Sequence, residues 1–143
     1  MATLPIQVLV AEDSEPFRRF LVSILRNRWE VHDIRAVSNG LEAVQEARRL
    51  KPNLILLDIG LPTLNGIEAA RRIRKLSPTS KIIFVTQESS ADIVQEALNI
   101  GACGYIVKAD VGSELLAAIT GVLRGEQFVG SRFADHHFSV ANQ

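Results

Sequence analysis

Apolar residues along the chain form short continuous runs that alternate with longer stretches of helical spacing. The runs are expected to be strands, and they cover 6–11, 54–57, 81–85 and 103–107. A further strand is expected at about 31–37, where apolar and polar residues are mixed. The run at 54–57 is apolar at every position, which is typical of a strand that is buried on both faces. The alternation therefore predicts a parallel sheet between two layers of helices.

Turn and capping residues separate these elements. Ser14 is expected to cap the first helix, and Pro16 fits the first turn of that helix. Ser89 or Ser90 is expected to cap the fourth helix, and Asp110 the fifth. The first expected helix follows residue 14, and the second follows the turn 38–40. The third covers 66–76, the fourth runs from 89–90 to 100, and the fifth runs from 110 to about 125.

Strands that alternate with helices are typical of the α/β class. Right-handed crossovers favour a three-layer flavodoxin-like (βα)5 fold with a five-stranded parallel sheet of order 2-1-3-4-5. This order places the first and third strands side by side, at the point where the order reverses. Residues 5–125 are expected to form this domain, whereas 126–143 lose the alternation and are expected to be a C-terminal linker or appendage.

Composition limits the class of protein further. The 143 residues are enough for one domain with a full core, and a hydrophobic share of 47% argues against disorder. Sixteen basic and sixteen acidic residues cancel, which argues against general attraction to nucleic acid or anionic membranes. Cys103 is the only cysteine, so we expect a buried, inert thiol. We find no signal peptide and no apolar run of membrane-spanning length, and we therefore expect a cytoplasmic protein with no membrane partner.

Polar groups that can handle a phosphate or a metal follow four of the five expected strands. Glu12 and Asp13 follow the first, Asp58 the third, Thr86 the fourth and Lys108 the fifth. Each alone is explained by a helix cap, a strand end, a turn or a surface charge. Parallel strands bring their carboxyl ends to one edge of the sheet, where open α/β folds bind their ligands. The joint occurrence of these groups therefore predicts a single site.

The residue types at this edge indicate phosphoryl transfer assisted by Mg²⁺. Neighbouring carboxylates repel one another unless a cation lies among them, and Mg²⁺ prefers carboxylate, water and phosphate oxygens. Asp58 follows the central strand and is the expected nucleophile, which would form an aspartyl phosphate. Thr86 and Lys108 are expected to neutralise the phosphoryl oxygens during transfer.

The motifs around these positions resemble those of a two-component response-regulator receiver domain. The acidic pair, the aspartate, the threonine and the lysine match the family pattern, as do D-x-x-x-P-x-x-N-G-I-E at 58–68 and S-N-G-x-E-A at 38–43. The resemblance covers about 7–125 and implies that Asp58 accepts a phosphoryl group from a sensor histidine kinase. It also implies that Asp13, Asp58 and the Gly60 carbonyl bind Mg²⁺, with Glu12 acting mainly through water.

The same resemblance implies a conformational switch. Thr86 would turn toward the phosphoryl group, and Tyr105, at the family's aromatic switch position, would rotate into the vacated space. The surface of the fourth helix, fifth strand and fifth helix would then change and favour a partner, including a second copy of the chain. Such a protein is not an enzyme for outside substrates, because it catalyses only its own phosphorylation and slow autodephosphorylation.

Residues 104–129 resemble receivers of the NarL/FixJ subfamily, which usually precede a LuxR-type helix-turn-helix domain. The tail 131–143 is short and not basic, so we expect no direct DNA binding by this chain. Control of transcription would then run through a LuxR-type domain outside it. The chain is interpreted either as a receiver excised from a transcription factor or as a stand-alone receiver.

Gln87 and Ala109 are among the positions that depart from the family pattern, and two other functions compete with the receiver interpretation. Gln87 is bulkier than the small residue usual at that position, and Ala109 replaces a proline whose peptide bond is cis in some relatives. A haloacid-dehalogenase-type phosphatase is the alternative function, but it needs a second aspartate where this chain has Gly60. A flavodoxin-like FMN module would need a phosphate loop after the first strand, where this chain has carboxylates.

Overall fold

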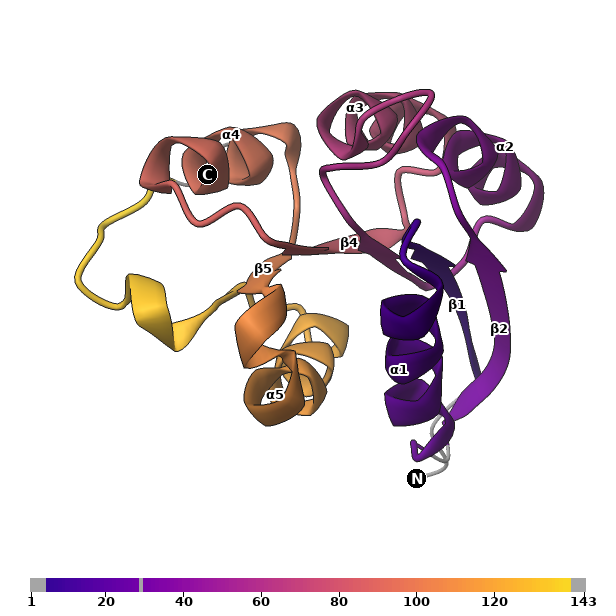
Figure 1. Cartoon of the computed structure of the whole chain (residues 1–143), viewed down its shortest axis with the longest axis horizontal. Coiled ribbons are helices and arrows are strands. Elements are labelled where there is room, and N and C mark those ends of the chain that lie inside the picture. The colour runs from indigo at the N-terminus through magenta and orange to yellow at the C-terminus, as the bar shows by residue number, and fades with distance from the viewer. Residues whose placement is uncertain (1–4, 29, 140–143) are drawn as a thin grey trace.

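The computed structural model describes residues 5–28 and 30–139, and a parallel sheet forms its centre (Figure 1). The sheet has the order β2-β1-β3-β4-β5-β6, and every neighbouring pair of strands is parallel. The strands are β1 (Ile6–Ala11), β2 (Val31–Val37), β3 (Leu54–Leu57), β4 (Lys81–Thr86), β5 (Gly104–Val107) and β6 (Phe128–Val129). The predicted flavodoxin-like order is thus confirmed, with one short strand added at the β5 edge.

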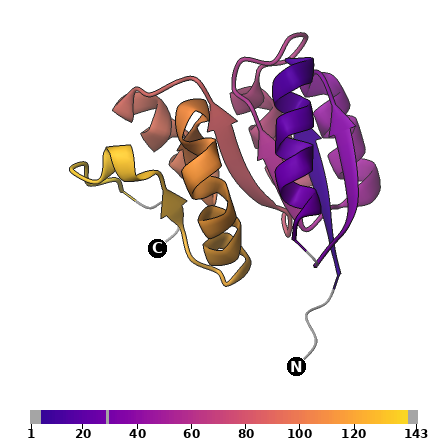
Figure 2. The same cartoon turned by 60° about the horizontal axis from the view of Figure 1, so that its bottom comes forward.

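Helices cover both faces of this sheet. α1 and α5 lie on one face, and α2, α3 and α4 lie on the other (Figure 1, Figure 2). The helices are α1 (Glu15–Arg26), α2 (Gly40–Leu50), α3 (Gly66–Leu76), α4 (Ala91–Ile100) and α5 (Val111–Leu123), with the short 3-10 helices η1 (Lys108–Asp110) and η2 (Ser131–Phe133). The architecture is therefore the predicted three-layer arrangement.

Neighbouring residues of one strand belong to different cores, one on each face of the sheet. On β1, Leu9 packs in the core under α2, α3 and α4, whereas Val8 and Val10 pack in the core under α1 and α5. All three side chains are fully buried. Burial on both faces explains the continuous apolar runs, and β2, at the edge of the sheet with several exposed positions, has no such run.

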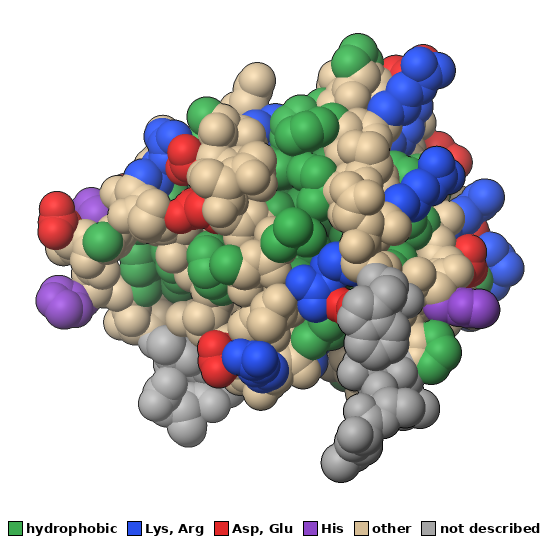
Figure 3. Space-filling view, turned by 90° about the horizontal axis from the view of Figure 1, so that it is seen from below, with side chains coloured by type: hydrophobic (Ala, Val, Ile, Leu, Met, Phe, Trp, Pro, Cys, Tyr) green, Lys and Arg blue, Asp and Glu red, His purple; other side chains and the backbone are tan. Residues whose placement is uncertain are grey.

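The outer surface of α1 and α5 carries exposed apolar side chains, as Figure 3 shows from below. Phe20 of α1 and Leu116 of α5 are 43% and 45% exposed, although helical spacing places both on apolar faces. Leu41 of α2 is likewise exposed. The apolar stripe of each of these helices is therefore wider than the surface that the core covers.

Side chains cap four of the helices. Ser14 and Ser90 cap α1 and α4 as expected, each by accepting a hydrogen bond from a backbone N–H in the first turn. Asn39 and Asn65, which the sequence marks as turn residues, cap α2 and α3 in the same way. Asp110 lies at the N-cap position of α5 as expected, but the expected side-chain cap is wrong, because its carboxylate makes no capping hydrogen bond to the helix.

The residues after α5 continue the fold. β6 pairs with β5 through Gly104 opposite Phe128 and Tyr105 opposite Val129. After β6, the chain curves from the edge of the sheet toward α4 (yellow in Figure 1). The described part of the expected linker thus lies against the domain.

Three smaller observations complete the fold. Cys103 is half-buried rather than buried. The peptide bonds of the described residues are trans, including the bond between Lys108 and Ala109. Within the described ranges, no helix combines the length and the apolar character that crossing a membrane requires.

Candidate functional site

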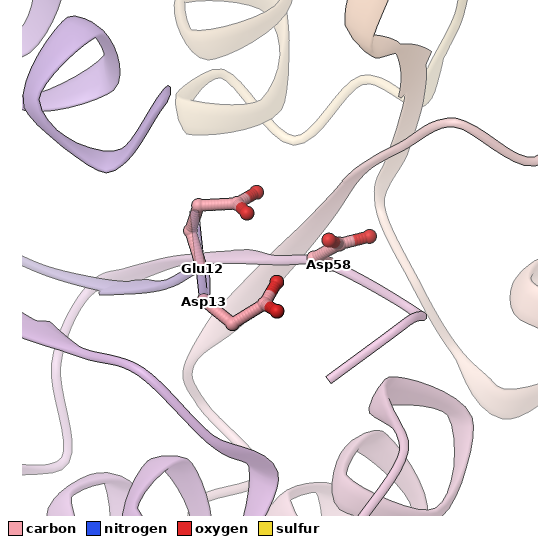
Figure 4. A group of neighbouring side chains, drawn as sticks. All are labelled: Glu12, Asp13 and Asp58. Atoms are coloured by element: carbon pink, nitrogen blue, oxygen red, sulfur yellow. The ribbon is translucent and has the colours of Figure 1, made fainter. Parts of the chain in front are cut away.

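The pairing of β1 with β3 brings the acidic residues of two strand ends together. Ala11 and Leu57 are partners in the register, and the Asp58 N–H donates to the Ala11 carbonyl at 3.1 Å. Glu12 and Asp13 follow β1, so their side chains lie beside Asp58, as Figure 4 shows. One oxygen atom from each of the three carboxylates lies within 4.8 Å of the others. The predicted convergence of these residues is therefore present.

The three carboxylates differ in exposure. Glu12 is 0% and Asp58 is 5% exposed, whereas Asp13 is exposed. Burial raises the pKa of the Glu12 carboxyl group, although hydrogen bonds from Lys108 and from the Ser14 backbone lower it in part. The charge of Asp58 raises this pKa as well. Two buried carboxylates side by side need a positive partner to remain ionised.

Lys108 is such a partner. Its Nζ lies 2.8 Å from Glu12 Oε1 and 3.0 Å from Asp58 Oδ2. Partial burial lowers the pKa of Lys108, but the hydrogen bonds to Glu12 and Asp58 and the charges of these two carboxylates raise it, so that the pKa lies above its usual value. The ammonium also lies 4.9 Å from the centroid of the Phe17 ring, within cation–π distance. Lys108 is therefore held in its charged form against both carboxylates.

The acidic cluster has the donors that Mg²⁺ prefers. Glu12 Oε2 accepts a hydrogen bond from the Ser14 N–H at 2.9 Å. Among the described residues, the buried Oε1 of Glu12 has no hydrogen-bond partner other than the Lys108 ammonium. Asp13 is exposed, which leaves its oxygens accessible to water. A hard divalent cation held by one or two carboxylates and by waters fits this set of oxygens.

The loop between β3 and α3 fixes the backbone of Asp58. The Gly60 N–H donates to Asp58 Oδ1 at 3.3 Å, which places Gly60 next to the carboxylate. The Gly66 N–H donates to the Ile59 carbonyl at 2.7 Å. A Cβ atom at Gly66 would lie 2.0 Å from the Asp58 carbonyl oxygen, so only glycine allows α3 to begin this close to the strand end.

Thr86 and Tyr105 both contact Glu88, in the loop between β4 and α4. Thr86 is 1% exposed, and its Oγ1 accepts a long hydrogen bond of 3.5 Å from the Glu88 N–H. Tyr105 is fully buried, and its hydroxyl donates to the Glu88 carbonyl at 2.8 Å. Burial, followed by the charges of Glu88 and Asp58, raises the pKa of Tyr105, so the hydroxyl keeps its proton. The two predicted switch residues are thus joined through one residue.

Sequence reasoning missed Phe17 and Arg18 as neighbours of the site. Arg18 Nη1 donates to the Glu12 carbonyl at 2.9 Å. Helical spacing places Phe17 on the apolar face of α1, yet its ring covers Lys108. Phe17 and Lys108 also line a hollow of about 550 Å³ together with Ser14, Gln87, Val107 and Ala109. Phe17 and Arg18 both lie in the first turn of the helix that follows the acidic pair. This position in the sequence is the signal that could have indicated that they lie near the site.

Comparison with known proteins identifies the family. The pattern of the response regulator receiver domain matches residues 8–120. The chemotaxis protein CheY of Halobacterium salinarum is 35% identical over 117 residues, which are 82% of this chain and 96% of that protein. The transcriptional regulatory protein LnrK of Bacillus subtilis is 32% identical over 120 residues, which are 84% of this chain and 54% of LnrK. The chain therefore spans about half the length of transcriptional regulators such as LnrK.

Solved structures agree with this assignment. A LuxR-family two-component response regulator from Aurantimonas sp. SI85-9A1 superposes with a TM-score of 0.85 at 25% identity, covering 91% of this chain and 93% of that one. The response regulator domain of Thermotoga maritima CheB superposes with a TM-score of 0.77 at 35% identity, covering 84% of this chain and 97% of that one. These comparisons do not support the phosphatase alternative. The chain belongs to the family of response regulator receiver domains of two-component systems.

Proposed function

We propose that Asp58 accepts a phosphoryl group from a sensor histidine kinase. A carboxylate oxygen of Asp58 would bond to phosphorus while the bond from phosphorus to the kinase histidine breaks, and that electron pair would return to the imidazole. The observation that carries the proposal is the position of the Lys108 ammonium, 2.8 Å from Glu12 and 3.0 Å from Asp58. It offsets the repulsion between these carboxylates and between Asp58 and the incoming phosphate.

Lys108 and Thr86 are proposed to stabilise the charge on the transferred group. Phosphoryl transfer depends mainly on positioning and on neutralising the phosphoryl oxygens. Lys108 already contacts Asp58. Thr86 accepts only a long hydrogen bond from the Glu88 N–H, so its hydroxyl loses little when it turns to donate to a phosphoryl oxygen.

Asp13, Asp58 and the Gly60 carbonyl are proposed to hold Mg²⁺, with Glu12 acting mainly through water. The bound ion would supply further neutralisation of phosphoryl charge. The proximity of the three carboxylates and the hydrogen bond from Gly60 to Asp58 support this assignment. The exposure of Asp13 leaves room for the water ligands that Mg²⁺ retains.

Phosphorylation is proposed to act through Thr86, Glu88 and Tyr105 on the surface of α4, β5 and α5. Tyr105 is already buried in this structure, so phosphorylation would stabilise this arrangement rather than bring the ring in from solvent. The surface would then bind a partner or a second copy of the chain. The similarity to a LuxR-family regulator favours control of transcription through a LuxR-type domain outside this chain, with no direct DNA binding by the chain itself.

The chain is proposed to act only on itself, through its own phosphorylation and slow autodephosphorylation. Gly60 occupies the position at which the phosphatase alternative needs an acidic side chain to protonate a leaving group. The supporting observation is that Gly60 offers Asp58 only a backbone N–H. Multiple turnover of outside phosphate esters is therefore not expected.

Intact mass after incubation with acetyl phosphate and Mg²⁺ tests the proposal. We expect the wild-type chain to gain one phosphoryl group, and Asp58→Asn to gain none because the amide is not a nucleophile. Asp33→Asn is the matched control, because Asp33 is an exposed aspartate on β2, away from the site. Equal labelling of Asp58→Asn and the wild type would contradict the proposal, and so would steady release of phosphate over many turnovers.

A further inference from the structure

The segment 130–139, called the C-terminal clasp below, packs across the ends of β5 and α5 and against α4. It follows β6 and runs along the edge of the sheet that lies beside Tyr105 (Figure 1, Figure 2). The proposed switch surface is formed by the same elements. The contacts of the clasp therefore bear on how that surface changes.

Charged groups hold the start of the clasp to α5 and to the turn before it. The Arg132 guanidinium donates to both oxygens of Asp110, from Nε at 2.6 Å and from Nη2 at 3.0 Å. Such a two-point pair fixes orientation as well as distance. The Ser131 N–H donates to Glu114 Oε2 of α5 at 3.0 Å.

A reciprocal pair of hydrogen bonds holds the end of the clasp to α4. Gln95 Nε2 donates to the Ser139 carbonyl at 2.8 Å, and the Ser139 N–H donates to Gln95 Oε1 at 2.9 Å. The amide of Gln95 thus satisfies both backbone groups of one residue. The clasp is fixed at both ends, to α5 through Ser131 and to α4 through Ser139.

Between these ends, aromatic side chains connect the clasp to the switch. Phe133 is 5% exposed, and its ring meets that of Tyr105 edge-on, with centroids 5.9 Å apart and an interplanar angle of 83°. Phe138 packs on Phe133 in the same way at 6.3 Å. Phe84 lies against Tyr105 at 6.1 Å. Phe133 therefore forms part of the environment that buries the Tyr105 ring.

A continuous series of contacts leads from the clasp to the phosphorylation site. Phe133 contacts Tyr105, the Tyr105 hydroxyl donates to the Glu88 carbonyl, and the Glu88 N–H donates to Thr86. Thr86 ends the strand next to Asp58. Spatial continuity alone does not establish coupling, which requires an element with two arrangements that both sites favour. In the proposed function Tyr105 is that element, because phosphorylation would stabilise its buried arrangement.

We propose that the clasp is an intramolecular ligand of the switch surface, which docks on the arrangement with buried Tyr105 and thereby favours phosphorylation of Asp58. The inference rests on the proposed function, in which phosphorylation stabilises the same arrangement. Linkage then makes the effect reciprocal, because whatever stabilises the docked clasp raises the affinity of Asp58 for a phosphoryl group, and the reverse.

Titration with beryllofluoride and Mg²⁺, a mimic of the phosphoryl group, tests the coupling. Binding is followed at the Gly60 amide resonance, which reports on Asp58 directly. We expect Phe133→Ala to lower the affinity for beryllofluoride by about two- to tenfold, the effect of one aromatic pair. Gln95→Ala, on the half-exposed side of α4, should lower it in the same direction and serves if Phe133→Ala does not fold. His137→Ala, an exposed position within the clasp, should leave it unchanged.

The reciprocal measurement is amide hydrogen exchange in the clasp. We expect saturating beryllofluoride to slow exchange of the Phe133 and Ser139 amides by a similar factor, and to leave exchange unchanged in Asp58→Asn. The coupling would be overturned if Phe133→Ala and Gln95→Ala bound beryllofluoride with unchanged or higher affinity. It would also be overturned if beryllofluoride left amide exchange in the clasp unchanged. Either result would leave the proposed function intact. Failure of the wild-type chain to bind beryllofluoride would overturn both.

Discussion

At the scale of single residues, the site depends on one cation between two buried carboxylates. Lys108 contacts Glu12 and Asp58, and the neighbouring charges leave the lysine with a raised pKa. The residue types were predictable from the sequence, because acidic and basic side chains directly follow the expected strands. The covering ring of Phe17 was not, because an aromatic residue in an amphipathic helix is usually assigned to the core.

Replacing Lys108 with methionine tests this arrangement. We expect Lys108→Met to slow phosphorylation by acetyl phosphate by about a hundredfold, as for the loss of one preorganised donor to a developing charge. The measurement is the single-turnover rate of phosphoryl incorporation. Lys75→Met, at an exposed lysine of α3, is the control and should react at the wild-type rate. A Lys108→Met rate close to that of the control would show that the ammonium has no role in transfer.

At the scale of elements, the close approach of α3 to β3 positions Asp58. A Cβ atom at Gly66 would lie 2.0 Å from the Asp58 carbonyl oxygen, and one at Gly40 would lie 1.7 Å from that of Leu64. Both contacts involve backbone, which cannot move aside as a flexible side chain would. The close packing of neighbouring elements therefore requires glycine at positions 40 and 66, in addition to any requirement of the turns in which they lie.

Substitution at Gly66 separates packing from turn formation. We expect Gly66→Ala to lower the free energy of unfolding by about 1–3 kcal/mol, as for an overpacked core. Urea denaturation measures the change. Gly112→Ala in α5 is the matched control, since a Cβ atom there meets nothing within 4 Å, and it should gain about 1 kcal/mol from better helix propensity. A Gly66→Ala chain as stable as the wild type would mean that α3 does not pack this closely on Asp58.

The link between β2 and α2 predicts a pH dependence. A hydrogen bond from Arg49, with a second from Arg35 of β2, lowers the pKa of Glu46 from 4.5 to about 2. A lowered folded-state pKa contributes stability that is present above the unfolded value and is lost as the pH falls through the folded value. We therefore expect wild type to be more stable than Glu46→Gln at pH 6, and the difference to shrink between pH 4.5 and 2. Urea unfolding at several pH values measures it. A difference that stays constant with pH would show that the carboxylate charge is not responsible.

Elements with strong local signals were predictable, and those that depend on distant contacts were not. The strand expected at 54–57 matches β3, because its continuous apolar run sets the limits of the strand, and the strand expected at 31–37 matches β2. β6 and η2 were missed. The two residues of β6 form too short a run to mark a strand, and β6 gains its order from pairing with β5. Asp110 has the local character of a cap, but its carboxylate is taken by Arg132, which lies 22 residues away. Local patterns carry no information on such a partner.

At the scale of the whole molecule, cation binding should couple to folding. The three carboxylates approach one another only when β1 and β3 are paired, so Mg²⁺ should bind the folded chain and not the unfolded one. We expect Mg²⁺ at a hundred times its dissociation constant to add about 2.7 kcal/mol to the free energy of unfolding. Urea unfolding with and without MgCl₂ measures the gain. The gain in the free energy of unfolding should shrink in Asp13→Asn and persist in Asp33→Asn. An equal gain in the wild type and both variants would show that the ion binds elsewhere.

The central claim is that Asp58, and no other side chain, accepts the phosphoryl group. Borohydride reduction of the phosphorylated chain is the most direct test, because it converts an aspartyl phosphate to homoserine at the modified position. Peptide mapping by mass spectrometry after treatment with acetyl phosphate and Mg²⁺ then locates the acceptor. We predict homoserine at position 58 alone, formed only when the phosphoryl donor is present. A reduced residue at position 12 or 13, or a phosphoryl group that survives borohydride on a serine or threonine, would contradict the claim.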